Sequence, residues 1–170
     1  MSNIIVHTNP SLYDKSVTLK ETFTLHPRRS RYILVSEAGL ENEFANFVTE
    51  IESGNKSYTL YTASDLQTMT SFFENQLIGT QLYIVATWDV ARMIFEAAVN
   101  AGFTEDEIQT KVIGDKKRYV YCMKCFQLND ATTKDKEIQC STCAAMLAVG
   151  PFYSKFRKGN IGYPFKPVVQ

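Results

Sequence analysis

The spacing of hydrophobic residues predicts a series of strands and helices in the middle of the chain. Runs rich in apolar and aromatic residues at 32–35, 58–61, 81–86 and 107–113 predict four short strands. Between them, apolar residues recur three and four positions apart, which is the spacing of one helical face. One such set comprises Phe44, Phe47, Val48 and Ile51. This alternation predicts an α/β fold, with a small parallel sheet between two layers of helices.

The first thirty residues show a different pattern. Apolar and polar side chains alternate over 16–25, which predicts a half-buried strand. We therefore expect residues 1–30 to form an extended N-terminal arm with one or two strands. Three arginines follow, namely Arg28, Arg29 and Arg31. They suit either a solvated turn before the next strand or a contact with an anion or a partner.

The balance of basic and acidic residues differs between the parts of the chain before and after residue 118. The 170-residue chain has a net charge of zero, but residues 1–118 carry 11 Lys and Arg against 15 Asp and Glu. Residues 119–170 carry 7 against 3. We therefore expect regions with different surroundings. We place the α/β domain at 31–118, a cysteine-rich module at 119–150 and an aromatic, basic tail at 151–170.

Composition is that of a folded protein, with 45% hydrophobic and 21% charged residues. No apolar run approaches the roughly 20 residues that span a bilayer. The first nine residues are too short and too polar for a secretory signal. We therefore expect a cytoplasmic protein with no membrane partner, in which thiols stay reduced. The small positive charge of residues 119–170 does not indicate a nucleic-acid partner.

The four cysteines form two C-x-x-C pairs. Cys122 and Cys125 are followed, after 14 residues, by Cys140 and Cys143. Two such turns can bring four thiolates into a tetrahedron, which is the geometry that zinc accepts. The pattern therefore predicts a zinc ribbon at 119–150. Because the protein fills all four positions, the metal would be structural.

Iron in a rubredoxin-like site is the alternative, since four thiolates suit zinc or iron. Rubredoxin knuckles usually have glycine after the second cysteine of each pair. Here those positions hold Phe126 and Ala144, which favours zinc. A redox-active C-x-x-C pair is a further alternative.

No catalytic residue is expected in this chain. It has no recognisable nucleophile motif or pair of acid–base carboxylates, and His7 and His26 lie outside metal-ligand spacing. The tail interleaves aromatic residues such as Phe152 and Phe156 with basic ones such as Arg157. It could dock a protein partner, fold back onto the rest of the chain or stack nucleic-acid bases.

Residues 82–113 resemble the last unit of the nicotinamide-binding domain in ferredoxin-reductase-like proteins. That family carries Cys-Gly-Pro after the strand, and the matching positions here are Ala86, Thr87 and Trp88. The loop at 36–39 has a single glycine and lacks the G-x-G-x-x-G fingerprint. We therefore expect a degenerate domain that keeps this architecture and does not bind a nucleotide.

A second resemblance covers residues 82–165. The chain is similar there to the small, DmmA-type subunit of dimethylamine monooxygenase, whose C-terminal part reads V-Y-C-x-x-C, C-x-x-C, L-x-V and then an aromatic, basic stretch. The matching segments are 120–125, 140–143, 147–149 and 152–156. The sequence differs at 151–153, where it has Pro-Phe-Tyr instead of the acidic-His-aromatic run common in the family.

This resemblance implies an accessory, non-catalytic subunit of a haem-dependent oxidative N-demethylase that acts on dimethylamine or a similar secondary amine. The implied partners are a haem-containing catalytic subunit, a reductase subunit with FMN and an iron–sulfur cluster, and a folate-binding subunit. The residues that carry over as metal ligands are Cys122, Cys125, Cys140 and Cys143. The implied role is assembly or docking for electron transfer. A rubredoxin-like electron carrier and a nucleic-acid-binding zinc ribbon are the alternative functions.

Overall fold

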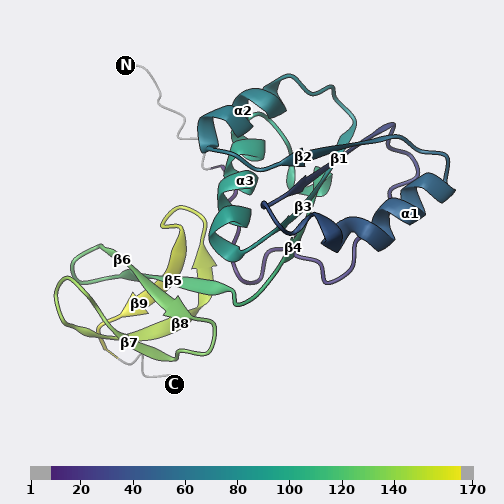
Figure 1. Cartoon of the computed structure of the whole chain (residues 1–170). Coiled ribbons are helices and arrows are strands. Elements are labelled where there is room, and N and C mark those ends of the chain that lie inside the picture. The colour runs from purple at the N-terminus through teal and green to yellow at the C-terminus, as the bar shows by residue number, and fades with distance from the viewer. Residues whose placement is uncertain (1–8, 166–170) are drawn as a thin grey trace, which may run out of the picture. The chain divides into compact units, whose positions relative to one another are not determined.

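The computed structural model describes residues 9–165, which form two compact units (Figure 1). One unit comprises residues 15–115, and the other comprises residues 116–165 together with residues 9–14. The fold class predicted from the sequence is confirmed, because a parallel-sheet α/β unit is followed by a β-sheet unit that carries the cysteines. Within the described residues, no helix is long and apolar enough to cross a membrane.

The α/β unit is built on four parallel strands. They are β1 (Arg31–Ser36), β2 (Tyr58–Thr62), β3 (Thr80–Ala86) and β4 (Ile108–Val112). Their order in the sheet is β2-β1-β3-β4, and each neighbouring pair is parallel. Every residue of β3 is buried, as expected for an inner strand that is covered by helices on both faces.

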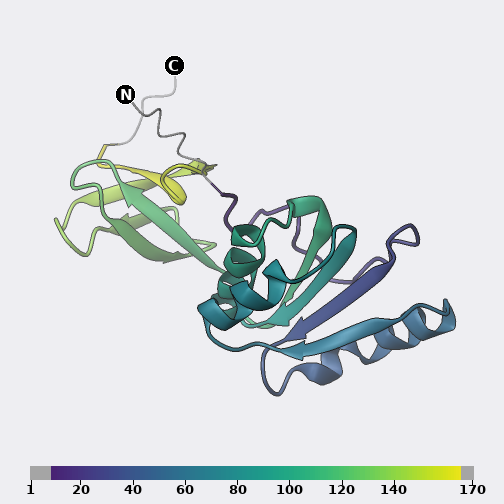
Figure 2. The same cartoon turned by 90° about the horizontal axis from the view of Figure 1, so that it is seen from above.

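Helices cover both faces of this sheet (Figure 2). They are η1 (Glu41–Phe44), α1 (Ala45–Ser53), α2 (Leu66–Glu74), α3 (Trp88–Asn100) and η2 (Glu105–Glu107). On one face, Phe47 and Ile51 of α1 pack with Leu34 of β1 and Tyr83 of β3. Helix α3 lies against β3 and β4, and α2 packs against α3. The unit therefore has the predicted three layers.

The strand predicted at 16–25 does not form. This segment makes a single bridge to the sheet, at Leu19 and Thr110. The side chain of Gln109 takes the place of a neighbouring strand further on, since it accepts a hydrogen bond from the Thr24 N–H at 2.9 Å and donates one to the Thr24 carbonyl at 2.8 Å. The alternation is also inverted at its start, because Val17 is 70% exposed.

The second unit is a mixed sheet of five strands. They are β5 (Lys117–Cys122), β6 (Leu128–Thr132), β7 (Glu137–Gln139), β8 (Met146–Ser154) and β9 (Gly159–Tyr163). Their order is β6-β5-β9-β8-β7, and β5 and β9 are parallel. Strand β8 crosses the boundary drawn at residue 150, and β9 lies between β5 and β8. Residues 151–163 are thus largely part of the sheet.

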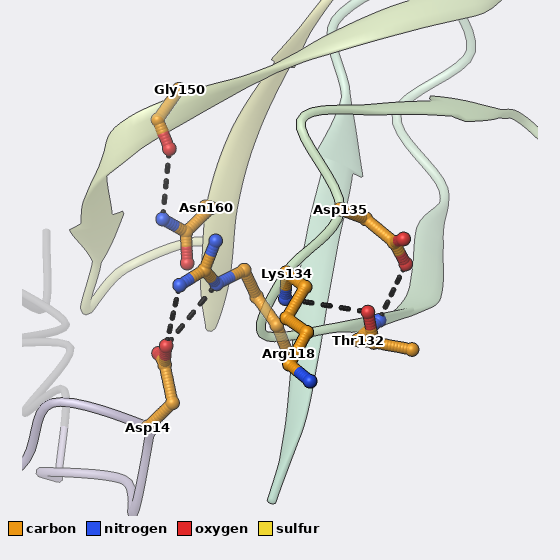
Figure 3. A network of polar contacts seen from close by, with 7 residues as sticks. All are labelled: Asp14, Arg118, Thr132, Lys134, Asp135, Gly150 and Asn160. Carbon is orange, nitrogen blue, oxygen red and sulfur yellow. Dashed lines mark hydrogen bonds and ion pairs between the residues drawn. The ribbon is translucent and has the colours of Figure 1, made fainter.

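A buried ion pair attaches the segment before residue 15 to this sheet (Figure 3). The Arg118 Nη2 atom lies 2.7 Å from Asp14 Oδ2, and Nε donates to the same oxygen at 3.2 Å. The exposed fractions of the two side chains are 15% and 6%. Nearby, the rings of Tyr13 and Tyr153 stack at 4.2 Å. These contacts explain why residues 9–14 belong to the second unit.

Removing the carboxylate of this pair should destabilise the second unit. We expect Asp14→Ala to lower the free energy of unfolding by about 3 kcal/mol, because it leaves the Arg118 guanidinium buried without its partner. Urea unfolding followed by tyrosine fluorescence would measure the change. The exposed Asp130 on β6 is the control, and its replacement by alanine should cost less than about 0.5 kcal/mol. Equal effects of the two substitutions would contradict this role.

Candidate metal centre

Each C-x-x-C pair lies at the turn of a β-hairpin. Cys122 is the last residue of β5, and Cys125 lies in the turn that leads to β6. Cys140 directly follows β7, and Cys143 precedes β8. The two hairpins belong to one sheet, and they bring the four predicted ligands together even though 14 residues separate the pairs in sequence.

The four sulfur atoms have the spacing that a tetrahedral metal needs. All lie within 4.8 Å of one another. Cys122 Sγ is 3.8 Å from Cys143 Sγ, and Cys125 Sγ is 3.5 Å from Cys140 Sγ. Four bonds of about 2.3 Å in a regular tetrahedron would place the sulfurs about 3.8 Å apart. The residues therefore fit a metal ion such as zinc or iron, and metal binding stays a prediction.

The backbone of the two knuckles is alike. Phe126 and Ala144 follow the second cysteine of their pairs, and both have positive φ angles, of 66° and 57°. The N–H of Phe126 donates to the Cys122 carbonyl at 2.8 Å, and that of Ala144 donates to the Cys140 carbonyl at 3.0 Å. The missing glycines therefore do not prevent the turn, and they do not discriminate zinc from iron.

Backbone N–H groups polarise the thiols. Without a metal, the Cys143 N–H lowers the pKa of Cys140 to about 6, in spite of the opposing effect of burial. The Gln127 N–H lowers the pKa of Cys125, but burial and the hydrogen bonds with neighbouring thiols outweigh it and raise that pKa to about 12. The pKa values of Cys140 and Cys125 are therefore shifted in opposite directions. A divalent cation would replace the remaining protons.

Asn129 positions the second knuckle, and sequence reasoning missed it. Asn and Asp are residue types typical of polar turns, but Asn129 and Asp130 both lie in β6 and Asn129 is buried. Asn129 Oδ1 accepts hydrogen bonds from the N–H and the hydroxyl of Ser141, at 2.9 and 3.0 Å. Its Nδ2 donates to the Val120 carbonyl at 3.3 Å. One amide thereby ties the first hairpin to the residue after Cys140.

Loss of this amide should weaken metal binding. Groups that orient metal ligands through hydrogen bonds are typically worth about 10- to 100-fold in metal affinity, so we expect a loss in that range for Asn129→Ala. Competition with a chromophoric chelator would measure the affinity of the zinc-loaded and cobalt-loaded protein. Asp130→Ala removes an exposed polar side chain from the same strand and should leave the affinity unchanged. An unchanged affinity in Asn129→Ala would refute the positioning role.

The carboxyl ends of β1 and β3 are where an open α/β sheet of this order binds ligands. In this chain a carboxylate of the protein lies there. Glu37, which follows β1, accepts hydrogen bonds from the N–H and hydroxyl of Thr87, at 2.8 and 2.7 Å. Thr87 is the N-cap residue of α3. The negative charge at the positive end of that helix is favourable, and it opposes a phosphate group at the same place.

We therefore expect the wild-type chain to show no saturable binding of NADH at concentrations up to about 1 mM, where a working site would bind its ligand.

Glu37→Ala should lower the free energy of unfolding of the α/β unit by about 1 kcal/mol, because α3 loses its cap. Trp88, the single tryptophan, is buried in this unit and reports its unfolding by fluorescence. Glu41→Ala, at an exposed acid of η1, is the control. Saturable quenching of the Trp88 fluorescence by NADH would overturn the interpretation that Glu37 opposes a phosphate group at the start of α3.

The histidine candidates and the arginine cluster at 28–31 do not belong to the unit that carries the cysteines, as far as the structure describes them. His26 Nε2 is 3.0 Å from Gln109 Nε2 in the α/β unit. His7 lies outside the described residues. Arg29 of the basic cluster is 3.5 Å from Glu107, an ion pair within the α/β unit. No catalytic role follows from these contacts.

Comparisons with known proteins identify no family. No protein-family profile matches the chain, and no curated protein matches it. Among solved structures, the chain is similar to phthalate dioxygenase reductase, described as a modular structure for electron transfer from pyridine nucleotides to a two-iron, two-sulfur centre. Sequence identity is 10% and the TM-score is 0.44. The match covers 69% of this chain and 48% of that structure, so the chain spans about half its length.

Proposed function

We propose that this chain is an accessory, non-catalytic subunit of a multi-subunit amine monooxygenase that demethylates dimethylamine or a similar secondary amine. Haem, FMN and an iron–sulfur cluster would reside in partner subunits, and a folate-binding subunit would belong to the same complex. The observation that carries the proposal is the four-sulfur cluster. Its four protein ligands leave a zinc ion no open position for water or substrate, so its role would be structural.

Two further features support a role without chemistry of its own. Glu37 occupies the place where a nucleotide phosphate would approach α3. Within the described residues, the group of His, Cys, Asp and Glu side chains that could hold a metal is the cysteine cluster. The reaction and the partners are proposed from the resemblance of residues 82–165 to the small dimethylamine monooxygenase subunit.

A rubredoxin-like electron carrier is the second candidate. Cys125 and Cys143 are half-buried, which would let an electron reach an iron bound at the cluster. The N–H groups of Lys124 and Cys125 point at Cys122 Sγ, at 3.3 and 3.5 Å, as they would around a charged sulfur. A carrier of this kind would be coloured when purified and would titrate reversibly with a reductant.

The test is capture of the tagged chain from its native host at low salt, followed by mass spectrometry and an absorption spectrum of the eluate. We expect a haem band and a flavin- and iron–sulfur-containing reductase among the captured proteins. Zinc, measured by mass spectrometry of the metal, should be present at one ion per chain. Cys122→Ala is the control, since loss of one ligand should unfold the cysteine-bearing unit and abolish capture.

A colourless protein that elutes alone, or with nucleic acid, would sink the proposal. A red protein with one iron per chain that titrates reversibly with a reductant would establish the carrier instead. If the Cys122→Ala chain keeps its metal and still captures the partners, the four-cysteine cluster is not required for assembly.

A further inference from the structure

A group of mostly exposed side chains lies beside the first knuckle, next to Cys122 and Cys125 in sequence or in contact with Tyr121 or Arg157. It consists of Tyr121, Phe126, Leu128, Phe156 and Arg157, which we call the aromatic patch. Phe126, Leu128 and Phe156 have exposed fractions of 59%, 42% and 65%, whereas Tyr121 is buried, with an exposed fraction of 9%. The rings of Tyr121 and Phe126 are 6.3 Å apart, and Tyr121 pairs with Leu128 across β5 and β6. Tyr121 is therefore a neighbour of both Phe126 and Leu128.

Arg157 connects the two sides of the patch. Its guanidinium carbon lies 4.8 Å from the centre of the Tyr121 ring and 5.0 Å from that of Phe156. Its Nη1 donates to the Tyr121 hydroxyl at 2.9 Å. Arginine and aromatic residues grouped around a buried ring are the composition of binding hot spots.

The backbone conformation of Phe126 indicates that its phenyl ring does not stabilise the fold. At a φ of 66°, a residue with a Cβ is strained by roughly 1–2 kcal/mol, and glycine would avoid that cost. The ring is mostly exposed, so it gains little by burial. A large apolar side chain that is both strained and exposed indicates a binding role.

The net charge of the unit that carries the aromatic patch indicates the charge that a binding partner would have. The sequence of the unit formed by residues 1–14 and 116–170 holds 10 Lys and Arg and 4 Asp and Glu, a net charge of +6. Residues 15–115 hold 8 and 14, a net charge of −6. A partner of the aromatic patch is therefore favoured when it is acidic.

Two other occupants fit less well. The −6 unit of a second copy has the right sign, but such a head-to-tail contact forms open chains unless its rotation closes a ring. Nucleic-acid bases stack on open ring faces, whereas Arg157 already lies over the rings of Tyr121 and Phe156.

We infer that the aromatic patch docks onto an acidic surface of a haem- or flavin-carrying partner protein, with Phe126 and Arg157 as anchors. This inference rests on the proposed function, since it names the surface through which that assembly forms. The metal cluster would hold the knuckle that presents Phe126.

The test measures affinity for the redox partner purified by the capture described above. We expect Phe126→Gly and Arg157→Glu each to weaken binding about 30-fold, as for hot-spot residues. Binding by the wild-type chain should also weaken as NaCl rises from 0.05 to 0.5 M, on the order of tenfold or more. Phe126→Gly should unfold at a temperature no lower than wild type, because it relieves the strained backbone.

Two controls test whether a loss of binding comes from the aromatic patch itself. They exclude an effect of the backbone change at a knuckle and an effect of removing any exposed apolar side chain. Ala144→Gly makes the same backbone change in the second knuckle without removing a ring, and it should bind like wild type. Ile78→Ala removes a fully exposed apolar side chain from the α/β unit and should also bind like wild type.

Undiminished binding by Phe126→Gly and Arg157→Glu would overturn the docking surface while leaving the accessory-subunit proposal intact. If the wild-type chain captures no haem or flavin protein, both proposals fail. Patch-dependent self-association in sedimentation, or patch-dependent retention of nucleic acid in the eluate, would overturn the acidic redox partner as the occupant.

Discussion

The four cysteine sulfurs within 4.8 Å of one another are the constraint on which the second unit depends. Four thiolates at that distance repel, and only a cation or retained protons can hold them together. The buried core around them is small, since Val120 and Leu147 share it with Cys122 and Cys140. Structural zinc typically contributes about 10–16 kcal/mol of folding free energy. In this unit, metal binding and folding would therefore be one process.

The α/β unit has the opposite character. It buries large aromatic side chains completely, with Tyr32 and Phe44 on the α1 face and Phe73 on α2. Such a core supports folding without a ligand. At the carboxyl edge of its sheet, where open α/β sheets bind ligands, Glu37 accepts a hydrogen bond from the Thr87 N–H. In this respect the α/β unit differs from the cysteine-bearing unit.

The fold class and the cysteine cluster could be predicted because each rests on a repeated pattern. Strand runs separated by helical periodicity specify a parallel sheet, and two C-x-x-C pairs specify a tetrahedron. Places where one side-chain amide makes hydrogen bonds that connect separate segments could not be predicted. The amide of Gln109 replaces a strand at Thr24, and that of Asn129 ties the hairpins together.

Strand β9 shows another limit of sequence patterns. Its composition, Gly-Asn-Ile-Gly-Tyr, is typical of a turn. The glycines are needed because β9 lies close to its neighbours, and a Cβ on Gly162 would come within 2.7 Å of Val120 Cγ1. Such a close approach is a property of two strands together, so no periodicity within either strand reveals it.

The metal cluster and the aromatic patch are linked by the backbone of one residue. The turn that sets the position of Cys125 also fixes Phe126 at positive φ, because the Phe126 N–H donates to the Cys122 carbonyl. In a chain without metal, the strain at Phe126 would favour release of this turn. A metal bound by Cys122 and Cys125 would offset that strain. Coordination by all four cysteines would leave such a metal no open position, and it would suit the proposed role of holding an exposed ring in a conformation that the chain alone disfavours.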